Sequence, residues 1–249
     1  MTVDSVTLSA LPRRANWIEL PFARPAFFST RTAGDMGRSF ETENATRVAA
    51  LGDLGLTASD VAWVKQEHTR DVVYVSERNS RLKSCKSVRV PAVADGVLLP
   101  GMAKYRAAGV TVADCLPIYL HNNRDGVTGV LHSGWKGTGI LDRALEILGA
   151  DTEVLFGPCI AGLCYAVPAQ RATAFASEWG DECVENRGGR WFLDIRRANL
   201  GIADRRGVRS VRIVSDCTHC NSDLWSYRRD GNAIFGLAAA VVLKDDHQR

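Results

Sequence analysis

Three residues far apart in the chain carry the side chains best suited to act together in chemistry, namely His68, Cys115 and His132. A thiolate beside an imidazole either shares a metal ion or acts as a nucleophile with its base. Two histidines and a cysteine with an open fourth position are typical of a catalytic zinc ion, which lowers the pKa of a bound water to about 7. Spacing alone leaves a plainer alternative open, since a buried histidine is more often a hydrogen-bonded core residue.

A predicted β-hairpin brings two of these residues together. Leu116–His121 and Gly126–Leu131 are strand-like runs, and the Asn and Asp residues between them favour a turn. A loop centred between residues 123 and 124 puts Cys115 opposite His132 at the open end of the hairpin, with Cβ atoms about 5 Å apart. A shift of register by one residue would remove this direct pairing. His68 follows another strand-like run, in WVKQEHTRDVV.

The remaining elements must form a scaffold for these side chains. Short apolar runs rich in Val, Ile and aromatic residues predict strands, whereas apolar residues at helical spacing predict helices. The predicted strands are Ala26–Thr30, Val61–Lys65, Asp71–Ser76, Leu116–Leu120, Val127–Leu131, Val154–Phe156 and Ser210–Val214, and Ala233–Leu243 is read as a buried strand. The predicted helices are Glu41–Leu54, Thr138–Leu148, Ala169–Trp179 and Arg196–Arg206.

Strands and helices do not alternate strictly in this order, which favours an α+β (mixed α/β) sandwich of mixed β-sheets flanked by helices over a doubly wound fold. We expect a single domain over residues 15–244, with flexible tails at 1–14 and 245–249.

Composition narrows the range of functions. The chain has 249 residues, with 31 Lys and Arg against 28 Asp and Glu, so its formal net charge is only +3. Such a small surplus argues against nucleic-acid binding but is compatible with a small anionic ligand. No signal peptide and no apolar run of about 20 residues is recognisable, so we expect a cytoplasmic protein without membrane contacts. An odd count of 7 Cys argues against a disulfide framework.

Several short motifs occur in the order in which they occur in one family. They are WVKQEH, PAVADGVL, TVADCLPIYL, GVLHSGWKGTG, FGPCIAGLCYAV, DCTHC and SYRRDG, and they extend from about Phe27 to Leu243. In these motifs the chain resembles the YfiH/DUF152 family, once called laccase-domain or polyphenol oxidase-like proteins. The resemblance implies a compact sandwich of mixed sheets and a zinc ion bound by His68, Cys115 and His132. It also implies phosphorolysis of adenosine, inosine or methylthioadenosine, and deamination of adenosine.

The same resemblance implies roles for further residues. Cys115, His132 and Asp114 are expected to be catalytic, with Asp114 accepting a hydrogen bond from a histidine ligand. Arg47, Lys136 and Arg228 are expected to bind the nucleoside substrate or the phosphate that attacks it. A surface salt bridge is an equally good interpretation of Arg228 and its neighbour Arg229. The implied partners are a purine nucleoside and phosphate, and the chain is expected to be a monomer or weak homodimer.

Three other functions remain open at this point. Cys115 and His132 are also the residues of a metal-free cysteine hydrolase, in a sandwich that resembles bacterial toxin deamidase domains. Copper bound by the same three ligands would give a weak polyphenol oxidase, although five histidines are too few for a multicopper site. A binding protein without turnover would retain the same residues.

The other cysteines suggest less. A structural zinc site of Cys159, Cys164, Cys217 and Cys220 is disfavoured, because the CxxxxC spacing is loose and cysteines beside strand-like apolar residues behave as small apolar residues. A redox pair of Cys217 and Cys220 is disfavoured because a redox CxxC usually opens a helix after a strand.

Overall fold

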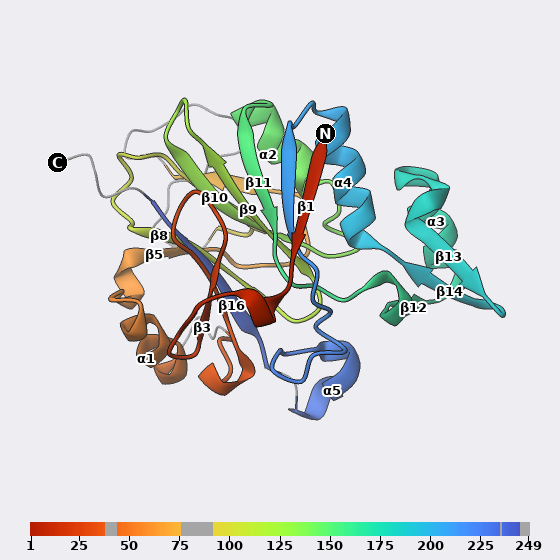
Figure 1. The fold of residues 1–249 in the computed structure, drawn as a ribbon, viewed down its shortest axis with the longest axis horizontal. Helices are drawn as coiled ribbons and strands as arrows, with labels where there is room; N and C mark the ends of the chain where they lie inside the picture. Colours follow the sequence, from red (N-terminus) through yellow and green to blue (C-terminus); the bar gives the residue numbers. More distant parts are fainter. Residues whose placement is uncertain (38–43, 76–91, 235, 245–249) are drawn as a thin grey trace.

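The computed structural model describes residues 1–37, 44–75, 92–234 and 236–244. Two large β-sheets face each other and form a sandwich, and helices cover its outer faces (Figure 1). The expected class, an α+β sandwich of mixed sheets flanked by helices, is therefore confirmed. Residues 245–249, expected to form a C-terminal tail, lie outside the described residues, as does Cys85. The six described cysteines form no disulfide.

The first large sheet has seven strands in the order β1-β15-β11-β9-β10-β7-β6. Its central strand β9 is antiparallel to both neighbours, β10 and β11, whereas β1, β15 and β11 run parallel at one edge and β6 and β7 at the other. The strands are β1 Thr2–Val6, β6 Val72–Tyr74, β7 Gly96–Leu99, β9 Leu116–Asn122, β10 Val127–Ser133, β11 Thr152–Phe156 and β15 Ser210–Val214.

The second large sheet has six strands in the order β2-β3-β4-β16-β8-β5, which are antiparallel except for the pair β5 and β8. Strands β8, β9 and β10 are buried along their whole length because both of their faces are covered, which explains their almost continuous apolar sequences. The strands are β2 Arg13–Arg14, β3 Trp17–Leu20, β4 Ala26–Ser29, β5 Val61–Trp63, β8 Ala107–Val112 and β16 Ala238–Leu243.

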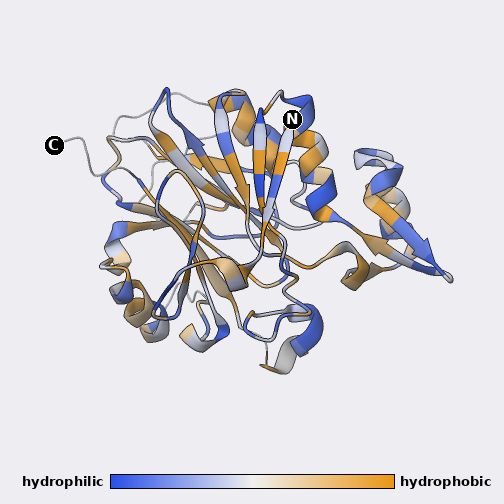
Figure 2. Ribbon diagram, viewed as in Figure 1, coloured by the Kyte–Doolittle hydropathy of each residue, from blue (hydrophilic) through white to orange (hydrophobic). Residues whose placement is uncertain are grey.

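Helices cover the two outer faces of the sandwich. Helices α2 and α4 contribute to the apolar cluster on the seven-stranded sheet, and α1 contributes to the cluster on the six-stranded sheet. Figure 2 shows how apolar segments concentrate in the layers between sheets and helices. The helices are α1 Ala45–Asp53, α2 Ile140–Leu148, α3 Ala169–Trp179, α4 Ile195–Arg205 and α5 Tyr227–Ile234.

A small third sheet forms the flank of the molecule that carries α3 (Figure 1). Its strands are β12 Ala166–Val167, β13 Val184–Arg187 and β14 Arg190–Leu193, in the order β12-β14-β13. Helix α3 packs on β14, and the apolar residues of this flank join the cluster of the seven-stranded sheet. This flank brings residues of α3 to the side of the candidate site described below.

The predicted helices are confirmed to within one or two residues, except at the start of the first, where residues 41–43 lie outside the described residues and α1 begins at Ala45. Two other expectations are corrected. Residues 1–14 do not form a frayed tail, because β1 pairs in parallel with β15 and β2 pairs with β3. The segment Ala233–Leu243 is not one strand, since its first residues belong to α5 and β16 starts at Ala238. Both differences depend on long-range strand pairing, which local apolar pattern does not report.

Candidate metal centre

His68, Cys115 and His132 converge at one end of the sandwich. Their ligand atoms all lie within 4.8 Å of one another, and Nε2 of His68 is 4.0 Å from Sγ of Cys115. The two imidazole rings meet edge to face, with 4.8 Å between centroids. His68 lies in the loop between β5 and β6 with a left-handed φ of 59°, Cys115 directly precedes β9, and His132 is in β10. A group of two nitrogen donors and one sulfur donor at these separations can hold one metal ion.

The hairpin that brings Cys115 and His132 together has a different register from the predicted one. His132 pairs with Pro117, and Ser133 pairs with Leu116. The turn is shifted by one residue because Asn122 belongs to the ladder and its side-chain oxygen accepts a hydrogen bond from the backbone N–H of Asp125. Gly126, whose φ of 63° is left-handed, closes the turn.

The corrected register puts Cys115 beyond the end of the ladder, where its side chain still reaches the two histidines. Gly134 follows the last paired residue of β10. A Cβ atom at Gly134 would lie 2.8 Å from Sγ of Cys115 and 3.1 Å from Cδ2 of His68. The absence of a side chain at this position is therefore what leaves room for the ligands.

Asp95, which directly precedes β7, forms hydrogen bonds that position two of the three ligands. Its fully buried carboxylate lies 2.7 Å from Nδ1 of His132 and accepts hydrogen bonds from the backbone N–H groups of Glu67, His68 and Thr69. Burial opposes ionisation of Asp95, but the bonds from His132 and Thr69 outweigh it and hold the pKa of Asp95 below its usual range. One carboxylate thus fixes the His68 loop and leaves Nε2 of His132 free to bind a metal.

Asp95 replaces the residue that the family resemblance indicated for this role. Asp114 has a left-handed φ of 79°, and its carboxylate accepts a hydrogen bond from the Thr218 hydroxyl at 2.6 Å and from the backbone N–H of Arg228 at 2.7 Å. The expectation that Asp114 contacts a histidine ligand is not met by these bonds. Asp114 instead ties the segment before Cys115 to the loop that follows β15.

Electrostatics favour the charged forms of the Cys115 and His132 pair. Burial raises the pKa of the Cys115 thiol, but the charge of His132 and hydrogen bonds from His132 and His68 lower the pKa to about 6. Burial likewise lowers the pKa of His132, while the Cys115 thiolate and Asp95 raise it above its usual range. Cys115 is therefore a thiolate at neutral pH, which is the form that binds metals and attacks electrophiles.

The cluster opens into a cavity of about 580 Å³. Aromatic side chains from separate elements contribute to its walls, namely those of Trp63, Trp135, Tyr165 and Tyr227. A concave, mainly apolar site with a few convergent polar groups is typical of small-molecule binding.

Only one of the three residues expected to bind phosphate lies on this cavity. Arg228 is in its lining, with its guanidinium 5.2 Å from the ring centroid of Tyr165. Arg47 is buried, lies 5.2 Å from the ring centroid of Trp63 and is not part of the lining. Lys136 also lies outside the lining, 5.6 Å from the centroid of Trp135.

A second arginine at the cavity was not predicted from the sequence. Arg171, in α3, lines the cavity with its guanidinium 4.4 Å from the ring centroid of Trp135. It belongs to no motif, and it reaches the site only because the third sheet carries α3 to this side of the sandwich.

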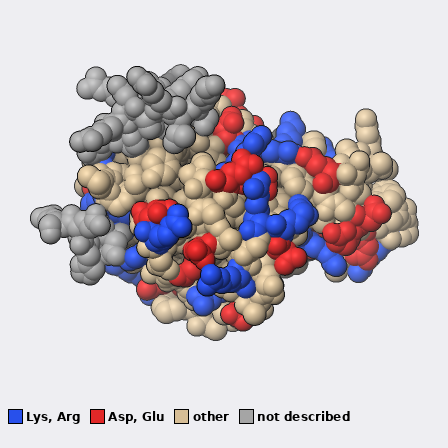
Figure 3. Space-filling view, turned by 90° about the horizontal axis from the view of Figure 1, so that it is seen from above, with Lys and Arg blue, Asp and Glu red and all other residues tan. Residues whose placement is uncertain are grey.

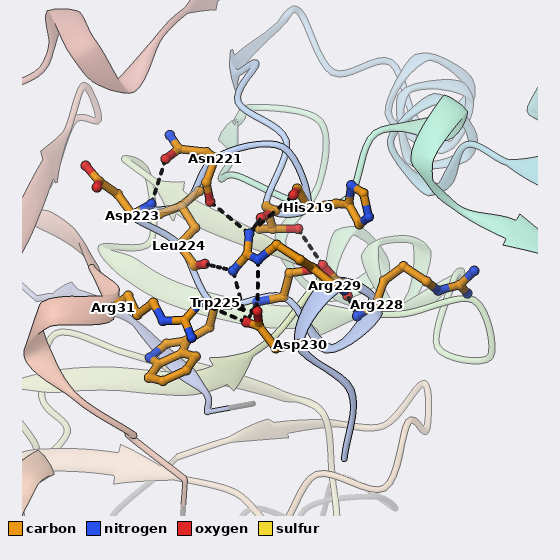
Figure 4. A network of polar contacts seen from close by, with 12 residues as sticks. Arg31, His219, Asn221, Asp223, Leu224, Trp225, Arg228, Arg229 and Asp230 are labelled. Atoms are coloured by element: carbon orange, nitrogen blue, oxygen red, sulfur yellow. Dashed lines mark hydrogen bonds and ion pairs between the residues drawn. The ribbon is translucent and has the colours of Figure 1, made fainter. Parts of the chain in front are cut away.

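Arg229 has a structural role, as one of the two sequence interpretations proposed. Its guanidinium donates to the carbonyl groups of Thr218, His219, Asn221 and Leu224 and to the carboxylate of Asp230 (Figure 4). Asp230 is also paired with Arg31 at 3.1 Å. The network fixes the loop that follows β15, and this loop supplies Thr218 to Asp114.

The surface and helices add two observations. On the face drawn in Figure 3, positive and negative side chains are interspersed, and no broad basic surface of the kind used for nucleic acid appears there. Within the described ranges, none of the helices combines the length and apolar character needed to cross a bilayer.

Together the fold and the site define a class, that of sandwich proteins of mixed sheets with a His–Cys–His cluster at the mouth of an aromatic cavity. The family described as "Multi-copper polyphenol oxidoreductase laccase" matches residues 30–245, and the chain belongs to this family.

Relatives and solved structures agree with this assignment. The chain is 33% identical over 209 residues to a protein of Deinococcus radiodurans named purine nucleoside phosphorylase, covering 81% of this chain and 76% of the relative. YlmD from Geobacillus stearothermophilus has the same fold, with a TM-score of 0.80, 23% identity and coverage of 95% and 99% of the two chains. YfiH of Bacillus licheniformis aligns with a TM-score of 0.78 at 19% identity, over 92% of this chain and 97% of the other. The resemblance to the YfiH family is thereby confirmed.

Proposed function

We propose that the protein is a zinc-dependent purine nucleoside phosphorylase that converts adenosine, inosine or methylthioadenosine to the free base and the corresponding ribose 1-phosphate. The observation that carries the proposal is the His68, Cys115 and His132 cluster, which lines one cavity together with aromatic residues and two arginines. Relatives named purine nucleoside phosphorylase support it, including the one from Deinococcus radiodurans.

The donor set fits zinc. A thiolate and two imidazoles leave a fourth position open, as catalytic zinc requires, and the carboxylate of Asp95 holds His132 in a fixed tautomer. When bound, zinc supplies Lewis-acid stabilisation for the negative charge that develops on the leaving group. Cys115 contributes a thiolate without a separate deprotonation step, since its thiol has a lowered pKa.

The chain's own residues bind and orient the two substrates. Phosphate attacks C1′ of the nucleoside, the bond from C1′ to the purine nitrogen breaks, and its electron pair remains on the base. We assign Arg171 and Arg228 to the phosphate, since both residues line the cavity. The purine, a flat apolar ring with polar edges, suits the aromatic part of the lining, to which Trp135 and Tyr165 contribute.

Tyr165 also supplies a hydrogen-bond donor. Burial, together with the charge of Cys115, raises the pKa of Tyr165, so its hydroxyl keeps its proton at neutral pH. A neutral phenol in the cavity wall can donate to a purine nitrogen or a ribose hydroxyl.

Product analysis tests the proposal. Zinc-loaded protein is incubated with adenosine, and in parallel with inosine and with methylthioadenosine, each with and without phosphate. The bases, nucleosides and sugar phosphates are separated by chromatography. From adenosine, adenine and ribose 1-phosphate that form only with phosphate are the expected result. Inosine formed from adenosine in both reactions would identify a deaminase instead, and unchanged adenosine, inosine and methylthioadenosine would refute the phosphorylase.

The arginine assignment has its own test. Arg171→Ala and Arg228→Ala should each raise the KM for phosphate about 10-fold or more, because each loses a charge-assisted contact. Arg143→Ala is the matched control, since Arg143 is exposed on α2, where it forms a surface ion pair with Glu146. An unchanged KM in both cavity variants would reject these two residues as phosphate ligands.

One observation favours a second candidate, the metal-free cysteine hydrolase. The lowered pKa of Cys115 beside His132 is also what an activated cysteine nucleophile requires. That function predicts activity that survives thorough chelation and is lost on stoichiometric alkylation of Cys115. Activity that falls with chelator and returns with zinc would reject it.

A further inference from the structure

A second group of metal-binding side chains lies where the loop after β15 meets the segment that follows β11. The ligand atoms of Cys164, His219 and Cys220 all lie within 4.8 Å of one another, and the sulfur atoms of Cys164 and Cys220 are 3.4 Å apart. Backbone pairing of Cys159 with Cys217, an isolated parallel β-bridge, holds the two segments together. The cluster is therefore built by tertiary contact between residues more than 50 positions apart in the chain.

One polar atom of this group, a ring nitrogen of His219, has no hydrogen-bond partner in the part of the protein that the structure describes. This atom, Nδ1, is buried. Buried polar nitrogen atoms in folded proteins almost always have a partner, because losing water without replacement is unfavourable. A metal ion bound through this nitrogen supplies the missing partner.

Cys217 adds a fourth donor that is already arranged for a negative charge. The backbone N–H of Ala161 donates to Sγ of Cys217 at 3.2 Å, which favours the negatively charged form of this sulfur. Its thiol neighbours those of Cys164 and Cys220, although Cys217 lies outside the group whose ligand atoms are all within 4.8 Å of one another.

We propose that Cys164, Cys217, His219 and Cys220 form a structural zinc site, separate from the candidate metal centre. Three thiolates and one imidazole are a common ligand set of closed zinc sites, and four protein donors leave no position for a substrate. With zinc–sulfur bonds of about 2.3 Å, tetrahedral ligands lie a little under 4 Å apart. The separation of 3.4 Å between Cys164 and Cys220 is close to that value.

The site would hold a loop that matters for the candidate metal centre. Thr218 lies between two of the proposed ligands, and its hydroxyl donates to Asp114, the residue directly before Cys115. Tyr165, a wall of the cavity, directly follows Cys164. A zinc ion bound here would therefore hold Thr218 and Tyr165 in position. This proposal does not depend on the reaction that the protein catalyses.

Metal analysis of the full chain tests the proposal. Protein purified under reducing conditions, with zinc supplied, should contain two zinc ions per chain by elemental analysis. Cys164→Ser and Cys220→Ser should each lower the content to one, and His132→Ala should do so by emptying the other site. Cys183→Ser is the matched control and should keep both ions, because the Cys183 thiol belongs to neither cluster and donates to the Trp179 carbonyl.

A measurement on the unmodified protein guards against variants that fail to fold. Titration with a mercurial thiol reagent should release two equivalents of zinc, and cobalt substitution should give thiolate-to-cobalt charge-transfer absorption that survives in His132→Ala. One zinc ion per chain that Cys220→Ser leaves unchanged would overturn the proposal. A disulfide between Cys164 and Cys220, seen as a loss of two mass units in the protein purified under reducing conditions, would overturn it as well.

Discussion

Two groups of cysteine and histidine residues in this molecule use the same ligand chemistry in opposite surroundings. At the candidate metal centre, His132 is held by the buried carboxylate of Asp95, and the cluster faces a cavity of about 580 Å³. In the thiol cluster of Cys164, Cys217, His219 and Cys220, the histidine has a buried nitrogen without a described partner. An oriented set with an open side suits catalysis, whereas a closed set of four donors suits a structural role.

The largest expected effect comes from removing a ligand of the open cluster. His68→Ala should lower phosphorolysis more than about 100-fold and empty the candidate metal centre, because two donors bind zinc far more weakly than three. The zinc of the thiol cluster should remain. Activity assays measure phosphorolysis, and elemental analysis measures the zinc content. Lys104→Ala, a change at an exposed residue, serves as the control. Retained activity in His68→Ala would reject this cluster as the active site.

A smaller loss should follow when the residue behind the ligands is changed. Asp95→Asn removes the negative charge next to Nδ1 of His132 and weakens the bonds to the His68 loop. Zinc affinity at the candidate centre should fall about 10- to 100-fold, as for other carboxylates that orient histidine ligands. Competition with a chromophoric chelator measures the affinity. Asp151→Asn, a change at an exposed residue, should have no effect, and equal affinities in both variants would contradict this role of Asp95.

The room that Gly134 leaves for the ligands of the candidate metal centre can be tested without changing any charge. In Gly134→Ala the new Cβ would approach Sγ of Cys115 to 2.8 Å, so the ligands must shift. We expect zinc affinity to fall about 10-fold, because displaced ligands no longer match the metal geometry. Gly52→Ala is the control, since a Cβ there meets nothing within 4 Å. If both variants bind zinc as the wild type does, the clearance at Gly134 is unimportant.

The smallest effect concerns the network that supports the loop between the two clusters. The hydrogen bond from Arg229, strengthened by Arg31, holds the pKa of Asp230 below its usual value. A depressed pKa stabilises the fold above the unfolded-state value of about 4, and this contribution is lost as pH falls through the folded-state pKa. Asp230→Asn should therefore lower the free energy of unfolding by about 1–3 kcal/mol at pH 7.

Denaturant unfolding at several pH values measures this difference. The gap between wild type and Asp230→Asn should stay constant from pH 7 to about 5 and shrink as the pH falls below about 4. Asp223→Asn, which removes a half-exposed ion pair with Arg13, is the matched control and should change stability by less than about 1 kcal/mol. A gap that widens in acid would contradict the assignment to Asp230.

Local sequence pattern was a good guide to the helices and to the β9 and β10 hairpin. Helix α3 spans the predicted residues, and β15 also has the predicted limits. Apolar periodicity and turn residues are local signals, so they predict helices and hairpins without information on the rest of the chain. The hairpin register was wrong because it depends on which residues the turn uses, and Asn122 and Gly126 decided that through their own conformations.

By itself, the sequence determined which side chains are available for chemistry and which motifs link the chain to its family. It placed His68, Cys115 and His132 in one hypothesis because residue types and hairpin order are written in the chain. Only the tertiary structure decided that Asp95 rather than Asp114 contacts His132, and that Arg171 rather than Arg47 lines the cavity. It also brought Cys164 to Cys220. These contacts join residues distant in sequence, and their geometry follows from sheet pairing and packing, which no local pattern encodes.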